Sequence, residues 1–247
     1  MNMHSEIEKL FPDRYSLIAR WYPSALLSLP FAAFIYSIGK AHLDCTQAGL
    51  YSAIVGVISS FVFCSGAMIV FYSDYVRSLG RKLQQKYFEK ALRLPTTEFM
   101  LWSTNEFSDE RKALLRQAIK DDFNIELPDK REEHNDESKA RRLISEAVDQ
   151  IRPRVKDGVR LLQYNIRFGF ARNLAAGSRE IGLPASLLFA ILSLVWLHDQ
   201  ACFIVESVLA VFYLWRVMKT KEMLDFFGEE YARVLFAEYL DCRTSKL

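Results

Sequence analysis

Uncharged runs long enough to cross a membrane lie near both ends of this chain, with a highly charged stretch between them. No charged residue lies between Arg20 and Lys40, and none lies between Asp44 and Asp74. A helix rises about 1.5 Å per residue, so a hydrocarbon core of about 30 Å takes roughly 20 apolar residues. Both runs reach that length and predict a transmembrane hairpin over residues 21–73. Its two spans cover about residues 21–39 and 48–73.

The last part of the chain holds a second pair of apolar runs. The run IGLPASLLFAILSLVWL is short but strongly apolar, and the run that follows it is interrupted only by Glu206. Three polar residues, 198–200, separate the two runs and predict a tight turn. We therefore expect a second transmembrane hairpin over residues 181–216, with spans at about 181–197 and 201–216.

The placement of lysine and arginine predicts the orientation in the membrane. Of the 32 lysine and arginine residues, Lys40 is the one that falls in a predicted outer loop. Basic residues collect on the cytoplasmic side of membrane proteins, so both termini and the central segment are expected there. The cytoplasmic parts are then an N-terminal segment (1–20), a central domain (74–180) and a C-terminal helix (217–247).

Apolar residues at three-to-four spacing predict that the central domain is helical. A first helix continues from the second span and ends before Pro95. Further helices are expected after a Ser108 cap, over residues 136–151, and over residues 158–173 with an end near Gly177. The fold class is therefore all-α, a polytopic membrane protein with two transmembrane helical hairpins flanking a helical cytoplasmic domain.

Composition narrows the function classes. The 247 residues carry a net charge of +2, so bulk charge does not favour nucleic-acid binding. The motifs GxxxxGK[ST], GxGxxG and GxSxG are absent, and the four cysteines have no metal-binding spacing. The charged run DKREEHND has no HExxH spacing and is interpreted as a solvated loop. We expect no catalytic residue, no metal site and no cofactor.

Glu206 is the candidate pore residue, because a carboxylate within a membrane span is costly and usually faces a cavity, a partner or a pore. In a symmetric oligomer it would form a carboxylate ring near the outer mouth, which favours cations. The alternative is a glutamate hydrogen-bonded within its own bundle. The small residues of the second span predict either a narrow pore lining or close helix packing. These small residues are Ser52, Gly56, Ser59 and Ser60.

Arginine and aromatic residues precede the third span and form a candidate ligand-binding or lipid-binding set. Three interpretations stay open: anchoring of anionic lipid headgroups, binding of an anionic nucleotide, or a generic basic and aromatic membrane flank. Arg81 and Lys82 extend the set from a parallel basic face. The residues before the third span are Tyr164, Arg167, Phe168, Arg172 and Arg179.

The order hairpin, helical domain, hairpin, with the segments LPTTEFMLWS (residues 94–103) and YNIRFGFARNL (residues 164–174), resembles small four-span effectors or sensors of bacterial anti-phage defence systems. The resemblance implies a homo-oligomer in the bacterial inner membrane. It also implies a soluble nucleotide-signalling or sensor protein as partner, and an anionic nucleotide as ligand.

These features predict an oligomeric, gated ion-conducting pore that depolarises the inner membrane when the cytoplasmic side senses an anionic ligand. The alternative is a non-conducting membrane sensor or scaffold that recruits a soluble partner through its cytoplasmic helical domain. The two differ in whether the protein itself passes ions.

Overall fold

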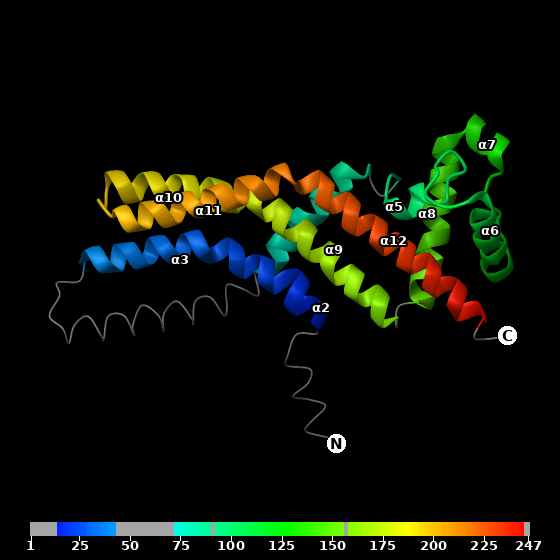
Figure 1. Cartoon of the computed structure of the whole chain (residues 1–247), viewed down its shortest axis with the longest axis horizontal. Helices are drawn as coiled ribbons and strands as arrows, with labels where there is room; N and C mark the ends of the chain where they lie inside the picture. Colours follow the sequence, from blue (N-terminus) through cyan, green and yellow to red (C-terminus); the bar gives the residue numbers. More distant parts are fainter. Residues whose placement is uncertain (1–13, 43–71, 90–91, 156–157, 245–247) are drawn as a thin grey trace, which may run out of the picture. The chain divides into compact units, whose positions relative to one another are not determined.

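The computed structural model describes residues 14–42, 72–89, 92–155 and 158–244, and all regular structure in these ranges is helical (Figure 1). The chain divides into two compact units. The first, here called the membrane unit, comprises residues 1–81 and 169–220, and the second, here called the polar unit, comprises residues 82–168 and 221–247. The all-helical prediction is confirmed for the part of the chain that is described.

The membrane unit is built from helices within residues 14–42 and 169–220 and from the first part of a helix over residues 72–87. Its other elements are α2 (Arg14–Ser16), the π-helical turn η1 (Leu17–Trp21), α3 (Tyr22–His42), the end of α9 (Val159–Gly177), the π-helical turn η2 (Ser178–Gly182), α10 (Leu183–Val195) and α11 (Gln200–Met218).

Three helical stretches are long and apolar enough to cross a membrane: Arg14–Gly39, Val159–Val195 and Gln200–Met218. They contain the first and fourth predicted spans and all but the last two residues of the third. Nearly all of the second predicted span, 48–73, lies outside the described residues. Helices long and apolar enough to cross a membrane therefore lie at three of the four predicted places, as expected of a membrane protein.

The predicted helix end near Gly177 is wrong. The backbone of Gly177 is helical (φ −66°, ψ −36°), and the helix continues through η2 and α10 to Val195. The glycine serves packing instead, because a Cβ atom at this position would overlap Cδ1 of Leu27 on α3. A glycine in an apolar helix signals close approach as readily as helix termination.

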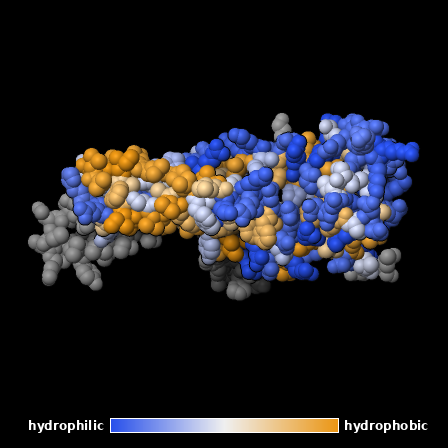
Figure 2. All heavy atoms as spheres, turned by 45° about the horizontal axis from the view of Figure 1, so that its top comes forward, coloured by the Kyte–Doolittle hydropathy of each residue, from blue (hydrophilic) through white to orange (hydrophobic). Residues whose placement is uncertain are grey.

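The helices of the membrane unit are apolar outside and partly polar inside. Figure 2 shows hydrophobic residues gathered over one part of the molecular surface. The exposed ones on α3, α10 and α11 include Leu29, Ile35, Leu188, Ile191, Val195, Ile204, Val208 and Val211. The buried polar or charged ones on α3, η2, α10 and α11 are Ser24, Ser37, Ser178, Ser186, Ser193, Glu206 and Arg216. This distribution suits a lipid bilayer, because there the outer apolar side chains contact lipid hydrocarbon and polar groups must find partners within the protein.

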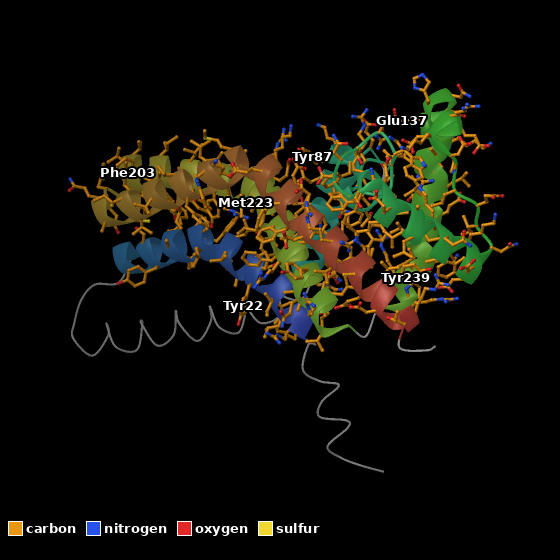
Figure 3. The ribbon with its side chains drawn as sticks, turned by 45° about the vertical axis from the view of Figure 1, so that its right-hand side comes forward. Tyr22, Tyr87, Glu137, Phe203, Met223 and Tyr239 are labelled. Carbon is orange, nitrogen blue, oxygen red and sulfur yellow. The ribbon has the colours of Figure 1, made fainter. Side chains whose placement is uncertain are left out.

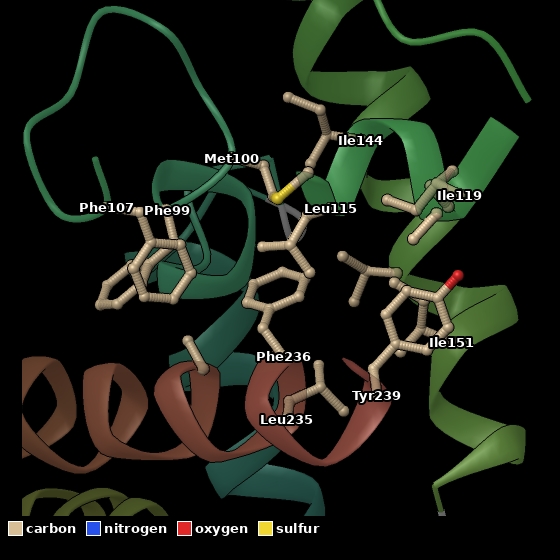
Figure 4. Close-up of a cluster of buried hydrophobic side chains, with 14 of the residues drawn as sticks. Phe99, Met100, Phe107, Leu115, Ile119, Ile144, Ile151, Leu235, Phe236 and Tyr239 are labelled. Carbon is tan, nitrogen blue, oxygen red and sulfur yellow. The ribbon is translucent and has the colours of Figure 1, made fainter. Parts of the chain in front are cut away.

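The polar unit has its own hydrophobic core (Figure 4). Its elements, besides parts of α9 and of helix 72–87, are α5 (Pro95–Glu98), α6 (Asp109–Phe123), α7 (Lys130–Asn135), α8 (Glu137–Arg154) and α12 (Thr220–Thr244). The predicted Ser108 cap of α6 is confirmed, since its hydroxyl accepts the backbone N–H of Arg111 at 3.3 Å. The C-terminal helix, which the sequence treats as a separate element, contributes Leu235, Phe236 and Tyr239 to this core.

The charged run DKREEHND is not the solvated loop that its composition indicates. Most of it forms α7, which Asp129 caps by accepting the backbone N–H groups of Arg131 and Glu132 at 2.8 Å. Glu133 is only 3% exposed and faces α6. On this short helix the carboxylate of Glu133 is therefore buried inside the unit, whereas the carboxylate of its neighbour Glu132 is exposed.

The Tyr213 ring packs directly against Gly182. A Cβ atom at Gly182 would lie 2.8–2.9 Å from three ring atoms of Tyr213. The ring is fully buried, and its hydroxyl donates to the Leu26 carbonyl oxygen at 2.7 Å, so it has little room to move. Gly182→Ala should therefore lower the free energy of unfolding in detergent micelles by about 1–3 kcal/mol, measured by thermal unfolding.

The control is the same change in a Tyr213→Ala background. Without the ring, alanine should be neutral or should stabilise by about 0.5–1 kcal/mol, because it favours helix more than glycine does. Equal losses in both backgrounds would contradict the assignment of the cost to Tyr213.

Candidate functional site

The buried polar face of α11 is the centre of the candidate site. The buried residues of this helix recur at three-to-four spacing and form one stripe: Cys202, Glu206, Ala210, Tyr213 and Arg216. The opposite face presents aliphatic side chains such as Val208 and Val211. Figure 3 draws the side chains along the ribbon, with Phe203 in the first turn of α11 and Tyr22 at the start of α3. The spacing turns the stripe toward the interior of the membrane unit.

Glu206 is fully buried within this stripe. It lies six residues after Gln200, so helix rise places it about 9 Å along α11. Ser186 of α10 is the polar side chain next to its carboxyl group. Neither carboxyl oxygen nor Ser186 Oγ makes a hydrogen bond of good geometry to the protein, among the residues that the structure describes. Buried polar groups in native structures are nearly always hydrogen-bonded, so an arrangement of this kind indicates a function or a missing partner.

Hydrogen bonds satisfy the polar groups toward the α10–α11 turn. Ser193 donates its hydroxyl to Cys202 Sγ at 3.1 Å, and Ser37 of α3 donates to Asp199 Oδ2 at 2.8 Å. Asp199 also caps α11 by accepting the backbone N–H groups of Ala201 and Cys202. The turn end of the stripe is thus closed, whereas the level of Ser186 and Glu206 carries unmatched polar atoms.

Glu206 does not lie where a carboxylate ring would require it. A ring at an oligomer axis needs the side chain on the outer surface of each chain, and here the carboxyl group lies inside the chain's own bundle. Facing the axis would require the helices around Glu206 to move apart. The other predicted pore residues, Ser52, Gly56, Ser59 and Ser60, lie outside the described residues.

The predicted ligand-binding set is divided between the two units. In the polar unit, the guanidinium carbon of Arg167 lies 5.6 Å from the centroid of the Tyr164 ring, and Phe168 packs in an apolar cluster with Phe88 and Leu224. Lys82 is exposed.

In the membrane unit the predicted residues also separate. Arg179 is exposed and pairs with Glu180 at 3.7 Å. Arg172 and Arg81 lie close enough to repel each other electrostatically, and Arg77 belongs to the same group. Of the predicted arginines in the membrane unit, Arg172 and Arg81 therefore lie near each other, whereas Arg179 is paired elsewhere.

Sequence reasoning placed Arg77 on the same basic face as Arg81 and Lys82, but it missed Tyr15 and Arg20 as members of this arginine group. Arg77 and Arg20 are electrostatic neighbours, and the guanidinium carbon of Arg20 lies 5.5 Å from the centroid of the Tyr15 ring. A signal was present, because each of these arginines lies at an end of an apolar run. Such ends meet at one membrane surface when the helices pack side by side.

No group of three or more histidine, cysteine, aspartate or glutamate side chains comes together among the described residues, so the described part offers no set of metal ligands. No protein-family model, no curated protein and no solved structure matches this chain. The functional argument therefore rests on the geometry of the chain itself.

Proposed function

We propose that this chain is a gated ion-conducting membrane protein in which Glu206 and neighbouring hydroxyl groups form the polar part of the conduction path. One observation carries the proposal. Both carboxyl oxygens of Glu206 and the hydroxyls of Ser178 and Ser186 are buried in an otherwise lipid-compatible bundle, and none makes a hydrogen bond of good geometry to the part of the chain that the structure describes. Evolution seldom keeps such groups in a membrane interior unless water, a proton or an ion visits them.

The contacts described here correspond to a closed state. Tyr213 seals one level of the bundle by its bond to the Leu26 carbonyl and by its contact with Gly182. Opening would separate α10 and α11 from α3, admit water to the level of Glu206, and let its carboxylate attract cations. Assembly into a homo-oligomer and depolarisation of a bacterial inner membrane, with both termini cytoplasmic, belong to the same proposal.

The chain connections support gating from outside the membrane. One boundary between the two units falls between Phe168 and Gly169, inside α9, and another falls between Arg81 and Lys82, inside helix 72–87. α9 continues without a break into α10. A rearrangement of the polar unit would therefore be transmitted along continuous helices rather than through flexible linkers.

Glu206→Gln tests the proposal. The amide keeps the size and the hydrogen-bonding capacity of the side chain but cannot carry the negative charge. For a cation-selective path, a tenfold KCl gradient across a liposome membrane gives a reversal potential approaching about 59 mV, the tenfold value for a singly charged species. Glu206→Gln should move it at least halfway to zero.

Glu180→Gln is the matched control, because Glu180 is exposed and paired with Arg179. It should leave the reversal potential unchanged. An absence of ion flux from the wild-type protein, in the presence and absence of phosphate ligands, would overturn the proposal. So would a reversal potential that Glu206→Gln does not alter.

A second candidate function is a membrane scaffold that recruits a soluble partner. The observation in its favour is that the polar unit has a hydrophobic core of its own, built from two segments far apart in the sequence. Full-length protein in lipid nanodiscs should then retain a soluble partner while conducting no ions. Ion flux that depends on Glu206 would show that the protein conducts ions and would exclude a purely scaffolding role.

A further inference from the structure

We propose that Arg20, Arg77 and Arg172, together with Tyr15, form a binding site for a phosphate group at the end of the membrane helices. The ligand class is a phosphate-bearing anion, either the headgroup of a phospholipid or a soluble phosphate compound. The inference deepens the proposed function by naming a ligand class for the gate. Only its link to gating rests on that function, because binding is measured without conduction.

Three helical segments converge at this place with unusually close packing. A Cβ atom at Gly169 of α9 would lie 3.1 Å from Cβ of Ala19 and 3.3 Å from the Tyr15 hydroxyl oxygen. A Cβ atom at Gly80 would overlap the side chain of Asn173. The Asn173 amide is buried and donates to the Ala19 carbonyl oxygen at 2.7 Å. The arginines are therefore carried by a fixed crossing of helices.

The arginines are held near one another in spite of their charge. Burial lowers the pKa of Arg77, and the charges of Arg20 and Arg81 lower it further. Tyr15 and Asp74 act in the opposite direction, with smaller effects than those two arginines. Like charges gathered on a rigid frame are a cost that a bound anion removes.

The orientation of the side chains suits anion capture. Nε of Arg172 donates to Asn173 Oδ1 at 3.3 Å, which sets the direction of its guanidinium group. Nε of Arg20 is buried and makes no hydrogen bond within the described ranges of the chain. Guanidinium groups present paired N–H donors that match phosphate oxygens, which is why arginine predominates at phosphate sites.

The position of the site along the helices supports the same ligand class. Arg20 directly precedes the first apolar run, and Arg77 follows the second within a few residues. Arg172 precedes the apolar run of α10 on the same continuous helix. The ends of apolar runs lie at the depth of lipid headgroups, where phosphate groups are concentrated.

The test uses full-length protein in nanodiscs of phosphatidylcholine. In one arm phosphatidic acid is added to the bilayer, and its retention is measured by native mass spectrometry. In the other arm pyrophosphate is added to the solution, and its affinity is measured by calorimetry. We expect saturable binding in at least one arm. Lipid retention alone identifies a headgroup site, and pyrophosphate binding alone identifies a site for a soluble ligand.

Arg77→Gln should weaken binding about tenfold or more, as expected for loss of a charge-assisted contact to phosphate. Arg20→Gln is a second variant in case the first does not fold. Arg179→Gln is the matched control, since it removes the same charge from an exposed position outside the group.

Equal weakening by Arg179→Gln and Arg77→Gln would show generic attraction of a basic surface and would overturn the site. An absence of saturable binding in both arms would also overturn it. Ion flux is recorded separately on the same samples. Binding without flux would contradict the proposed conduction and leave this site standing, whereas flux without binding would do the reverse.

Discussion

Replacing Glu133 with alanine should lower the free energy of unfolding of the polar unit by about 3–5 kcal/mol, the cost of removing one partner from a buried ion pair. Glu133 is 3% exposed and accepts the backbone N–H groups of Trp102 and Ser103 at 2.9 Å each. Its carboxylate also lies 3.6 Å from the Arg116 guanidinium group. One side chain thus satisfies two backbone donors and one buried charge.

The loss is large because Arg116 stays behind. Burial lowers the pKa of Arg116 to about 10, and the charge of Glu133 acts against this effect. Arg116 still donates to the carbonyl oxygens of Met100 and Pro128, at 2.6 Å each, so it is anchored in place without its counter-ion. The variant therefore leaves a buried cation and two backbone N–H groups uncompensated.

Glu132→Ala is the matched control, because this neighbouring glutamate is exposed. Its carboxylate accepts the backbone N–H of Asp129 in the capping box of α7, at 3.0 Å. It should cost about 1 kcal/mol, a value typical of a helix cap. Urea unfolding in detergent micelles, followed by circular dichroism, measures both variants. Equal losses would refute the special role of Glu133.

The contrast between Glu132 and Glu133 shows what sequence pattern could not supply. Periodicity identifies helices and caps because these depend on residues a few positions apart, as at Ser108. Within a charged run, the residue that turns inward depends on where distant segments present free N–H groups. For Glu133 those groups belong to Trp102 and Ser103, in a different part of the chain.

The sequence likewise predicts some residues of the candidate site but not their neighbours in space. Hydropathy marked Glu206 as an unusual residue, because a charge within an apolar run is visible in the sequence alone. Its neighbour Ser186 comes from another helix and depends on the packing of α10 against α11. The arginine group joins Arg20, Arg77 and Arg172 from three separate segments. The sequence indicated that the basic face of Arg77 and Arg81 extends the set of Arg172, but no local pattern indicated that Arg20 joins them.

The contacts of the C-terminal helix also could not be predicted from the sequence. The sequence indicates a helix after the fourth apolar run but not what its apolar face contacts. In the structure Phe236 is fully buried, and its ring centroid lies 5.9 Å from that of Phe107 in an edge-to-face arrangement. Leu235 and Tyr239 enter the same core. α12 therefore completes a core that residues 99–161 leave open.

Phe236→Ala should accordingly lower the free energy of unfolding of the polar unit by about 3–5 kcal/mol, because it removes an aromatic side chain from a packed core and leaves a cavity. Phe226→Ala is the matched control, since Phe226 lies on the same helix but is 59% exposed. It should change stability by less than about 0.5 kcal/mol. Urea unfolding of the full chain in detergent micelles distinguishes the two. If both variants lose little, α12 contributes no core to the polar unit. A large loss from Phe236→Ala alone means that the helix after the last apolar run completes the core of the polar unit.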